Sequence, residues 1–498
     1  MIVLAAILFF IVVYRRERAL PLFVRLAVVG VAGGIITSYL WLPFLRYEQY
    51  LEISPYLQRY KYDSFPALDT LALLFGGNLY DHGRLPVLTL LIALGGAAAM
   101  VERARTRKLA LALFGVWLLI YFGRATWGKI ADLLPMSDGI FMHRFIGGVD
   151  FAAVLLIGIG GEWIWSRFSR LGEPWRALAP GAIIVALMIP AFVERYQFYG
   201  ANTAWMRYAK SSLDSATGLR EIVGTLKTLP PGRTYAGLRS TWADKTKIGG
   251  LHLYDVLAFN DVDLVAPPYQ GLSLNCDMPF FFNENEPADY DLFDARYVVT
   301  MDNIPMPSFV KPIKKSGQYV LYGVETSGYG ELAKSVAAGV AVSREMLLDR
   351  NKAWLTGGGP QAGRFIRWSY RLGSGTLGGV FYPPMPQGGT VSEERIEPGL
   401  MRFKVSAPGA SVLVIKTTYH PNWRVTIDGR AAEDFMVSPS FIGVRVPAGT
   451  HDVQAQYVSG RIKIALLAIG AAVLLGAIIF RRGFERLDDV FSRPTRNQ

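Results

Sequence analysis

Residues 419–461 constrain the fold of this chain most strongly, because short alternating runs there lead directly into an apolar run. The dipeptide Asp428-Gly429 follows the first alternating run, and it is a preferred sequence for a two-residue β-hairpin turn. Phe441–Val446 and His451–Tyr457 alternate in the same way. The pattern predicts a small antiparallel sheet whose last strand ends at Ile462–Phe480, a run apolar enough to cross a membrane.

The composition favours a membrane protein. The 498 residues are 51% hydrophobic and only 18% charged, and the mean hydropathy is +0.25. The net charge is +12, but Lys and Arg concentrate at the ends of apolar runs, where they act as topology signals. No basic stripe with interleaved aromatic residues is present, so nucleic-acid binding is not expected. The single cysteine, Cys276, excludes an intramolecular disulfide, and a Cys-based zinc site is not expected.

Apolar runs divide the first part of the chain into predicted membrane spans. Before Ile462–Phe480 they are Met1–Tyr14, Leu26–Leu45, Leu85–Val101, Leu109–Phe122, Phe145–Trp165 and Ala177–Val193. Leu68–Phe75 is predicted to be a short re-entrant or interfacial helix. Met1–Tyr14 is shorter than the roughly 20 residues that span a bilayer. One expectation is therefore that the chain is the C-terminal part of a longer protein.

The positions of basic residues predict the topology. The short basic connections are 15–25, 102–108, 166–176 and 481–486, and all four can be cytoplasmic under the positive-inside rule. Residues 46–84, 123–144 and 195–461 are then outside. This predicts about seven spans, with the N-terminus outside and the C-terminus inside. The expected location is the cytoplasmic (inner) membrane of a bacterium, with a large periplasmic domain.

The predicted fold class is a polytopic α-helical membrane protein with a large extracytoplasmic α/β region and β-sandwich before the last helix. The predicted domains are a six-span helix bundle (1–194), a mixed α/β region (195–334), a β-sandwich (335–460), and the last span with its tail (461–498). Within the mixed region, Ser215–Leu229 is a predicted amphipathic helix, and Tyr297–Thr300 and Gln318–Val324 are predicted strands. From 335 to 460 the signal is nearly all β, with recurring Gly and Pro turn clusters.

Polar residues at the membrane surface are the first candidates for a site, because burying charge in a membrane is costly. His143 and Arg144 lie at the predicted outer end of one span, where an Arg can hold a phosphate through charge-assisted hydrogen bonds. Arg144 as a plain anchor for lipid headgroups is the alternative. Asp150 lies inside the start of the same span and Glu162 near its other end; both also suit a capping or snorkelling role.

The predicted outer loops carry several carboxylates: Glu48, Glu52, Asp63, Asp69 and Asp81 in the first and Asp132 and Asp138 in the second. Glycosyl transfer needs a carboxylate that takes a proton from the acceptor hydroxyl, and it sometimes needs a divalent metal, Mg²⁺ or Mn²⁺. Asp63, Asp69 and Asp138 are the catalytic candidates, although solvated loops normally contain such residues. The sequence names no metal ligand and contains no HExxH or GxSxG motif.

Aromatic residues in the predicted sandwich offer a second kind of site. Exposed rings can stack on sugars, and Trp354 and Trp423 are the candidates. The alternative is that these rings belong to the hydrophobic core, which is the commoner role of aromatic residues at period two.

The segment around the Asp428-Gly429 turn resembles the C-terminal end of bacterial YfhO-like membrane proteins. Their pattern is a tyrosine-proline-x-tryptophan strand, a DG hairpin and a G-V-x-V-P-x-G-x-H-x-V strand pair before a last membrane helix. The matching residues are Tyr419, Pro421, Trp423, Asp428, Gly429, Gly443, Val444, Val446, Pro447, Gly449, His451 and Val453. The wider layout resembles GT-C-type membrane glycosyltransferases and a membrane protein group labelled after 6-pyruvoyl-tetrahydropterin synthase, through the end of the span at Trp41–Phe44 and the F-x-H-R-F segment at Phe141–Phe145.

The resemblance implies sugar transfer from a polyprenyl-phosphate donor to a glycan acceptor at the outer membrane face, in envelope polysaccharide or glycolipid assembly. Such enzymes carry an acidic residue in the first outer loop after their first helix. Here the expectation is either that this part is missing from the chain or that the loop 46–84 takes its place. Two other hypotheses stay open. One is a non-catalytic envelope protein whose sandwich binds glycan or a protein partner, and the other is a transporter.

Overall fold

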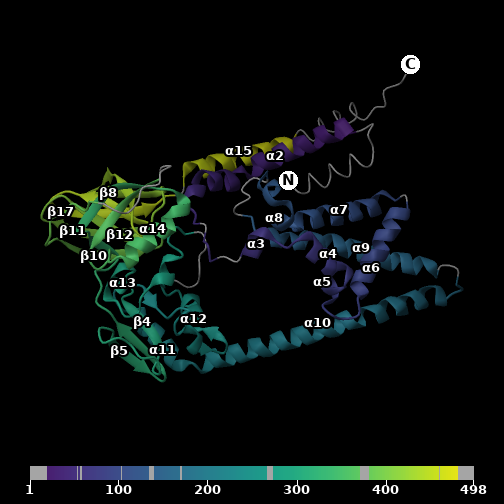
Figure 1. The fold of residues 1–498 in the computed structure, drawn as a ribbon, viewed down its shortest axis with the longest axis horizontal. Helices are drawn as coiled ribbons and strands as arrows, with labels where there is room; N and C mark the ends of the chain where they lie inside the picture. Colours follow the sequence, from purple (N-terminus) through teal and green to yellow (C-terminus); the bar gives the residue numbers. More distant parts are fainter. Residues whose placement is uncertain are drawn as a thin grey trace, which may run out of the picture. The chain divides into compact units, whose positions relative to one another are not determined.

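The structure is a computed structural model that describes residues 19–52, 54–56, 59–102, 104–133, 140–168, 171–265, 273–370, 381–458 and 460–479 (Figure 1). The chain divides into two compact units. The helical unit is formed by Met1–Leu45, Leu57–Asn202 and Ile462–Gln498, and the sheet unit by Arg46–Tyr56 and Thr203–Arg461.

The helical unit contains long apolar helices joined by short ones. Its elements are α2 (Ala19–Tyr47), α3 (Arg59–Asp63), α4 (Ala67–Phe75), α5 (Asn78–Asp81), α6 (Val87–Val101), α7 (Arg105–Tyr121), α8 (Gly123–Trp127), η3 (Gly128–Leu133), η5 (Met142–Phe145), α9 (Ile146–Arg167), α10 (Trp175–Ser215) and α15 (Arg461–Ile479). The predicted short helix at Leu68–Phe75 is confirmed as α4. The predicted span at Met1–Tyr14 lies outside the described residues.

Four helices in the described part of the chain are long and apolar enough to cross a membrane: Ala27–Tyr50, Met142–Arg167, Trp175–Ser215 and Arg461–Ile479. A fifth span results if α7 and the following Gly123–Leu133, bent by 78° against each other, count as one. The predicted span at Leu85–Val101 is the 15-residue helix α6, which is only about 22 Å long. The structure therefore supports a membrane protein with four or five spans among the described residues, and the count of about seven stays a prediction.

Helices α6 and α9 approach each other closely through glycines. A Cβ atom on Gly95 of α6 would lie 1.9 Å from the carbonyl oxygen of Leu156, and one on Gly160 of α9 would lie 2.3 Å from that of Leu91. Small residues let helix backbones approach in this way, which is the usual packing of membrane helices. The contact fixes α9, the helix that carries Asp150, against α6.

The sheet unit combines helices with four sheets. Its helices are η2 (Glu48–Tyr50), α11 (Thr217–Leu226), η6 (Ala243–Lys245), α12 (Leu253–Phe259), η7 (Met278–Phe281), α13 (Pro287–Leu292) and α14 (Arg344–Thr356). Its strands are β1 (Thr234–Tyr235), β2 (Lys247–Ile248), β3 (Leu251–His252), β4 (Tyr297–Met301), β5 (Lys311–Ser316), β6 (Tyr319–Gly323), β7 (Gly330–Leu332), β8 (Ser335–Val342), β9 (Arg364–Tyr370), β10 (Thr390–Glu397), β11 (Leu400–Ala407), β12 (Ser411–Thr418), β13 (Trp423–Ile427), β14 (Arg430–Ala432), β15 (Asp434–Val437), β16 (Phe441–Val446) and β17 (Gly449–Tyr457).

The first part of the sheet unit combines helices with a small mixed sheet. Its four-stranded sheet has the order β1-β4-β6-β5, and β4 and β6 correspond to the two strands expected from the sequence. The predicted amphipathic helix at Ser215–Leu229 is α11, and its apolar face packs against β5 and β6. The preceding helix α10 continues past the predicted end of its span at Val193 to Ser215.

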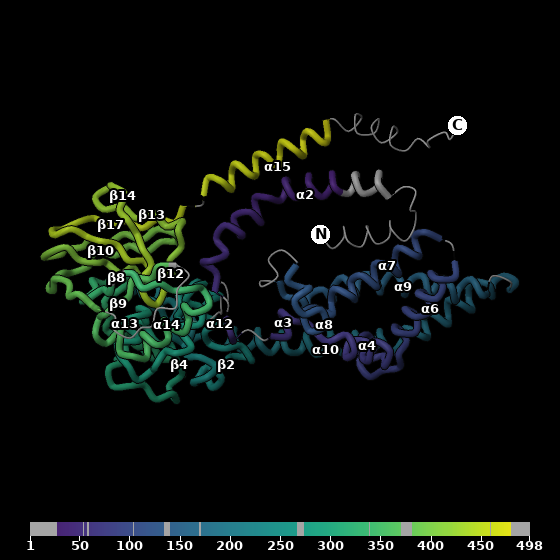
Figure 2. The backbone as a smooth tube through the Cα atoms, turned by 45° about the horizontal axis from the view of Figure 1, so that its top comes forward, coloured from purple at the N-terminus to yellow at the C-terminus, as the bar shows by residue number. Residues whose placement is uncertain are grey.

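Two further sheets form the sheet-rich part of the unit, shown in green to yellow in Figure 2. One has the order β10-β11-β17-β13-β14 and the other β7-β12-β16-β15-β9-β8. They share one core, to which β11 contributes Phe403 and Val405, and β16 contributes Ile442 and Val444. Burial of alternate residues along β11 shows that one face of this strand is covered, as in a sandwich.

The DG hairpin forms as the sequence predicts. Asp428 and Gly429 both have positive φ values, 51° and 76°, and Ile427 pairs with Arg430 across the turn. A two-residue turn with both central residues at positive φ has the twist that joins antiparallel strands. The Asp428 carboxylate also accepts hydrogen bonds from the Asp452 amide and from His451, so the side chain fixes the turn as well.

The prediction that residues 335–460 are nearly all β missed the 13-residue helix α14. Strands β8 and β9, on either side of it, are parallel. Parallel neighbours cannot be joined by a tight turn and need a long crossover, usually a helix. The turn residues Gly357–Pro360 directly follow this crossover helix.

Candidate functional site

Helix α3 and the short helix η5 carry the predicted phosphate-binding residues and one of the predicted carboxylates. The two elements pack against each other within the helical unit. The ring centroids of Tyr62 and Phe141 lie 4.8 Å apart, and those of Tyr60 and His143 lie 6.0 Å apart. Two loops that are distant in sequence, one after α2 and one before α9, therefore converge at this point.

His143 is held in one tautomer. Its Nδ1 lies 2.7 Å from the carbonyl oxygen of Lys61, and because a carbonyl only accepts hydrogen bonds, Nδ1 must carry the hydrogen. The other ring nitrogen, Nε2, makes no hydrogen bond to any residue that the structure describes. It can accept a proton or, once protonated, donate a hydrogen bond to an anion.

Arg144 is exposed, and its guanidinium lies over the Phe141 ring at 4.8 Å from the centroid. Stacking on an aromatic face orients a guanidinium without using its N–H donors. The N–H donors of the exposed Arg144 guanidinium therefore stay available, which suits bidentate binding of a phosphate.

Asp63 ends α3, and its backbone is held close to α8. Gly123 has a positive φ of 53°, and a Cβ atom there would lie 2.4 Å from the carbonyl oxygen of Asp63. The amide of Ala67 also donates a hydrogen bond to Thr126 of α8. The absence of a side chain at Gly123 thus determines where the end of α3 can lie.

We refer to Arg59, Lys61, Asp63, His143 and Arg144 as the α3–η5 cluster. Within the described ranges, its three permanent cations form no ion pair with a carboxylate. One carboxylate beside three cations and a histidine leaves the cluster net positive. An uncompensated positive group next to helices that can cross a membrane is suited to bind an anionic lipid headgroup.

The other candidates are placed elsewhere. Asp69 is exposed in the first turn of α4, and Asp150 is exposed on α9. Asp138 lies outside the described residues. Asp63 and Asp69 are the predicted catalytic carboxylates that the structure describes. Of these two, only Asp63 lies on a helix, α3, that packs against η5, the element that carries His143 and Arg144.

The stacking role proposed for Trp354 and Trp423 is not supported by their positions. Trp354 is only 4% exposed, lies on α14 rather than on a strand, and donates from Nε1 to the carbonyl oxygen of Arg364. Trp423 is 8% exposed and packs in the core between the two sheets. Both rings are core residues, so neither presents a face on which a sugar ring can stack.

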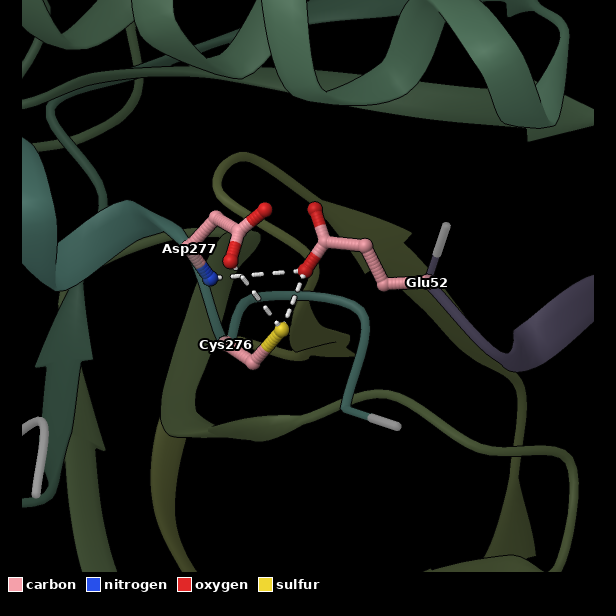
Figure 3. A group of neighbouring side chains, drawn as sticks. All are labelled: Glu52, Cys276 and Asp277. Carbon is pink, nitrogen blue, oxygen red and sulfur yellow. Dashed lines mark hydrogen bonds between the residues drawn. The ribbon is translucent and has the colours of Figure 1, made fainter. Parts of the chain in front are cut away.

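A second group of functional side chains lies in the sheet unit and combines Glu52, Cys276 and Asp277 (Figure 3). The Cys276 thiol lies 2.8 Å from Oε2 of Glu52. Burial, and to a lesser extent the neighbouring Asp277 carboxylate, raises the pKa of Glu52 to about 7. No pattern in the sequence connects Cys276 with Glu52, a carboxylate 224 positions away.

Neither group fits the expected Mg²⁺ or Mn²⁺. Both ions prefer oxygen ligands, and Mg²⁺ in particular is held by carboxylates, substrate phosphates and water. The α3–η5 cluster offers one carboxylate among three cations, and the second group includes a thiol. No step involving these ions is therefore assigned to either group.

No protein-family model, curated protein or solved structure matches the chain.

Proposed function

We propose that this protein binds a polyprenyl-phosphate-linked sugar through the α3–η5 cluster and takes part in glycosyl transfer at the outer face of the bacterial inner membrane. The observation that carries the proposal is the packing of α3, which carries Asp63, against η5, which carries His143 and Arg144. Among the described residues, none of the cluster's three permanent cations forms an ion pair. In this proposal the chain has about seven spans, and the α3–η5 cluster and the sheet unit lie on the extracytoplasmic side.

Each residue of the cluster has a distinct role in the proposed reaction. Arg144 holds the phosphate of the donor, and His143 lies beside it as a second polar group for the phosphate. Asp63 takes the proton from the acceptor hydroxyl, whose oxygen forms the new bond to the anomeric carbon. The bond from that carbon to the phosphate oxygen breaks, and polyprenyl phosphate leaves with the electron pair. Arg144 and His143 stabilise the negative charge that develops on it.

The phosphate-binding role is tested with the purified full-length protein in nanodiscs and polyprenyl phosphate as the ligand. Arg144→Ala should weaken binding about tenfold or more, because hydrogen bonds to charged groups contribute about 1.5–3 kcal/mol. Arg167→Ala is the matched control, since Arg167 lies at the opposite end of α9 and stacks on Trp163 at 4.2 Å in the same way. Equal effects of the two substitutions would show general headgroup anchoring and contradict the proposal.

The role of Asp63 is tested by transfer of a radiolabelled sugar from the lipid-linked donor to membrane glycan. Asp63→Asn should leave polyprenyl-phosphate binding unchanged and reduce transfer by about 100-fold or more, the usual contribution of a general base. Asp69→Asn, an exposed carboxylate in the same loop, should leave both unchanged. Full transfer by Asp63→Asn would exclude Asp63 as the base.

A further inference from the structure

The Glu52, Cys276 and Asp277 group converges from two separate segments of the sheet unit. Its three candidate ligand atoms all lie within 4.8 Å of one another. Besides its contact with Glu52, the Cys276 sulfur lies 3.5 Å from Oδ1 of Asp277. Figure 3 shows the sulfur and the two carboxylates directed toward one another.

The segment that carries Glu52 is fixed on both sides of this residue. Arg344 donates from Nε to the carbonyl oxygen of Leu51 at 2.6 Å and lies 3.8 Å from the Glu48 carboxylate. After Glu52, the ring of Tyr56 packs edge-on against Phe280, with centroids 5.3 Å apart. Glu52 is therefore directed to Cys276 by its neighbours and does not reach it from a free loop.

The turn that carries Cys276 and Asp277 is equally well defined. The Cys276 amide donates to the carbonyl oxygen of Ser273, and the Phe280 amide donates to that of Asp277. Asp277 itself is 0% exposed. The ligand atoms are therefore presented by backbone that is held by hydrogen bonds.

The group places two carboxylates next to each other, of which Asp277 is buried and Glu52 is half-buried. Glu52 and Asp277 are like-charged neighbours, and the groups that act on the Glu52 carboxylate are Cys276 and Asp277, neither of which is a cation. Two facing carboxylates are unfavourable unless a proton or a metal ion lies between them. A metal ion would also convert the thiol to a thiolate, and the released proton would pass to solvent.

The donor set selects the kind of metal ion. A thiolate with two carboxylates suits Zn²⁺, which accepts sulfur and oxygen ligands in a tetrahedron. In such a tetrahedron the sulfur and oxygen ligands lie about 3.5 Å apart. The observed distances of 2.8 and 3.5 Å from sulfur to the two carboxylates need only a small adjustment.

A cavity gives access to the group. It has a volume of about 180 Å³, and Cys276 lies on its wall together with the polar residues Ser273, Asn275 and Thr418. Ser273 and Thr418 both donate hydrogen bonds to Oδ1 of Asn275. A polar cavity of this size admits water, which supplies both an entry path for the ion and a fourth ligand.

We propose that Glu52, Cys276 and Asp277 bind one divalent cation of the zinc class, with a water from the adjoining cavity as the fourth ligand. The ion connects the segment that follows α2 to the turn before η7 in the sheet unit. This site is separate from the α3–η5 cluster and does not depend on the function proposed for that cluster.

Co²⁺ is the probe that tests the site, because a thiolate bound to Co²⁺ gives a charge-transfer band in the near ultraviolet. The full-length protein in detergent is treated with a chelator and a thiol reductant, and Co²⁺ is then titrated. The band should appear at one equivalent of Co²⁺, disappear when Zn²⁺ is added and persist in a large excess of Mg²⁺. Absence of the band would overturn the proposal.

Variants distinguish binding by all three residues from binding of the metal ion by the Cys276 thiol alone. Cys276→Ser should abolish the band, and Glu52→Gln and Asp277→Asn should each weaken Co²⁺ binding about tenfold or more. Glu325→Gln, at an exposed carboxylate elsewhere in the sheet unit, is the control and should bind normally. Unchanged affinity in both Glu52→Gln and Asp277→Asn would identify an adventitious ion only.

A measurement on the unmodified protein covers the case in which a variant fails to fold. Alkylation of Cys276 by a maleimide should slow markedly when Zn²⁺ is added and should not change with Mg²⁺. The same rate with and without Zn²⁺ would contradict the proposal. Polyprenyl-phosphate binding by Cys276→Ser should stay normal, so failure of one site is distinguishable from failure of the other.

Discussion

Single residues give the α3–η5 cluster its chemistry, because their polar atoms are oriented before any ligand is present. The bond from Nδ1 of His143 to the Lys61 carbonyl selects the tautomer, and the Phe141 ring positions the Arg144 guanidinium. Such preorganisation lowers the entropy cost of binding. The sequence identified His143 and Arg144 from their position before an apolar run, but it could not predict that Lys61 would orient the histidine.

Asp289 on α13 is a residue whose charge opposes folding. Burial, and more weakly the nearby Glu286 carboxylate, raises the pKa of Asp289 to about 6, although the Asn283 amide donates to it. The folded protein therefore binds a proton more tightly than the unfolded chain does. Stability must fall as the pH rises from about 4 to about 6, and the full penalty is present above that range.

Asp289→Asn should remove this penalty. The variant is expected to be more stable than the parent by about 1–2 kcal/mol at pH 7.5, and the difference should shrink toward pH 4.5. Thermal unfolding of the full-length protein followed by tryptophan fluorescence measures it. A difference that is independent of pH would contradict the assigned pKa.

Asp291 on the same helix serves as the control, because its pKa is shifted in the opposite direction. Burial would raise its pKa, but Lys416 and Ser327 outweigh this effect, so that the pKa of Asp291 is lowered. Lys416 is fully buried and lies 3.2 Å from this carboxylate. Asp291→Asn should therefore destabilise the protein at pH 7.5, because it leaves a buried ammonium with less compensation.

At the scale of elements, local signals in the sequence were reliable and long-range ones were not. The Asp428-Gly429 hairpin and the strand at Phe441–Val446 follow from nearest neighbours and turn chemistry, and both are confirmed. Helix α14 was missed because its presence depends on the parallel pairing of β8 and β9. The meeting of Glu52 with Cys276 depends on tertiary packing alone, so no pattern in the sequence predicts it.

Gly123 controls the position of α3 relative to α8. Gly123→Ala should destabilise the protein by about 1–3 kcal/mol and weaken polyprenyl-phosphate binding, because its Cβ atom would clash with the Asp63 carbonyl. Gly128→Ala is the control for backbone strain, because Gly128, with φ 52° and ψ −129°, lies outside the conformations that alanine adopts at positive φ. Gly128 has nearly the same φ, 52°, but a Cβ atom there meets nothing within 4 Å.

The comparison of these two variants isolates the clash from backbone strain. Thermal unfolding and lipid binding should both be affected more by Gly123→Ala than by Gly128→Ala. Equal losses in the two variants would mean that backbone strain alone matters and that the approach of Asp63 to Gly123 is not required.

At the scale of the whole molecule, the sequence predicted the class of the protein better than its details. Apolar runs that became α2, α9, α10 and α15 were recognised, because length and hydropathy alone decide whether a helix can cross a membrane. The separation into two units was not predicted in full. The sequence assigned residues 46–84 to one outer loop, whereas the structure divides them, with Arg46–Tyr56 in the sheet unit and the rest in the helical unit.

Photolabelling tests the central claim most directly. The full-length protein in nanodiscs is irradiated with a polyprenyl-phosphate analogue that carries a photoreactive group next to the phosphate, and the labelled peptides are identified by mass spectrometry. The account predicts labelling within 59–63 and 141–145, reduced by Arg144→Ala and by excess unlabelled polyprenyl phosphate. Labelling spread evenly over all apolar helices, or centred on the basic connection 102–108, would contradict it.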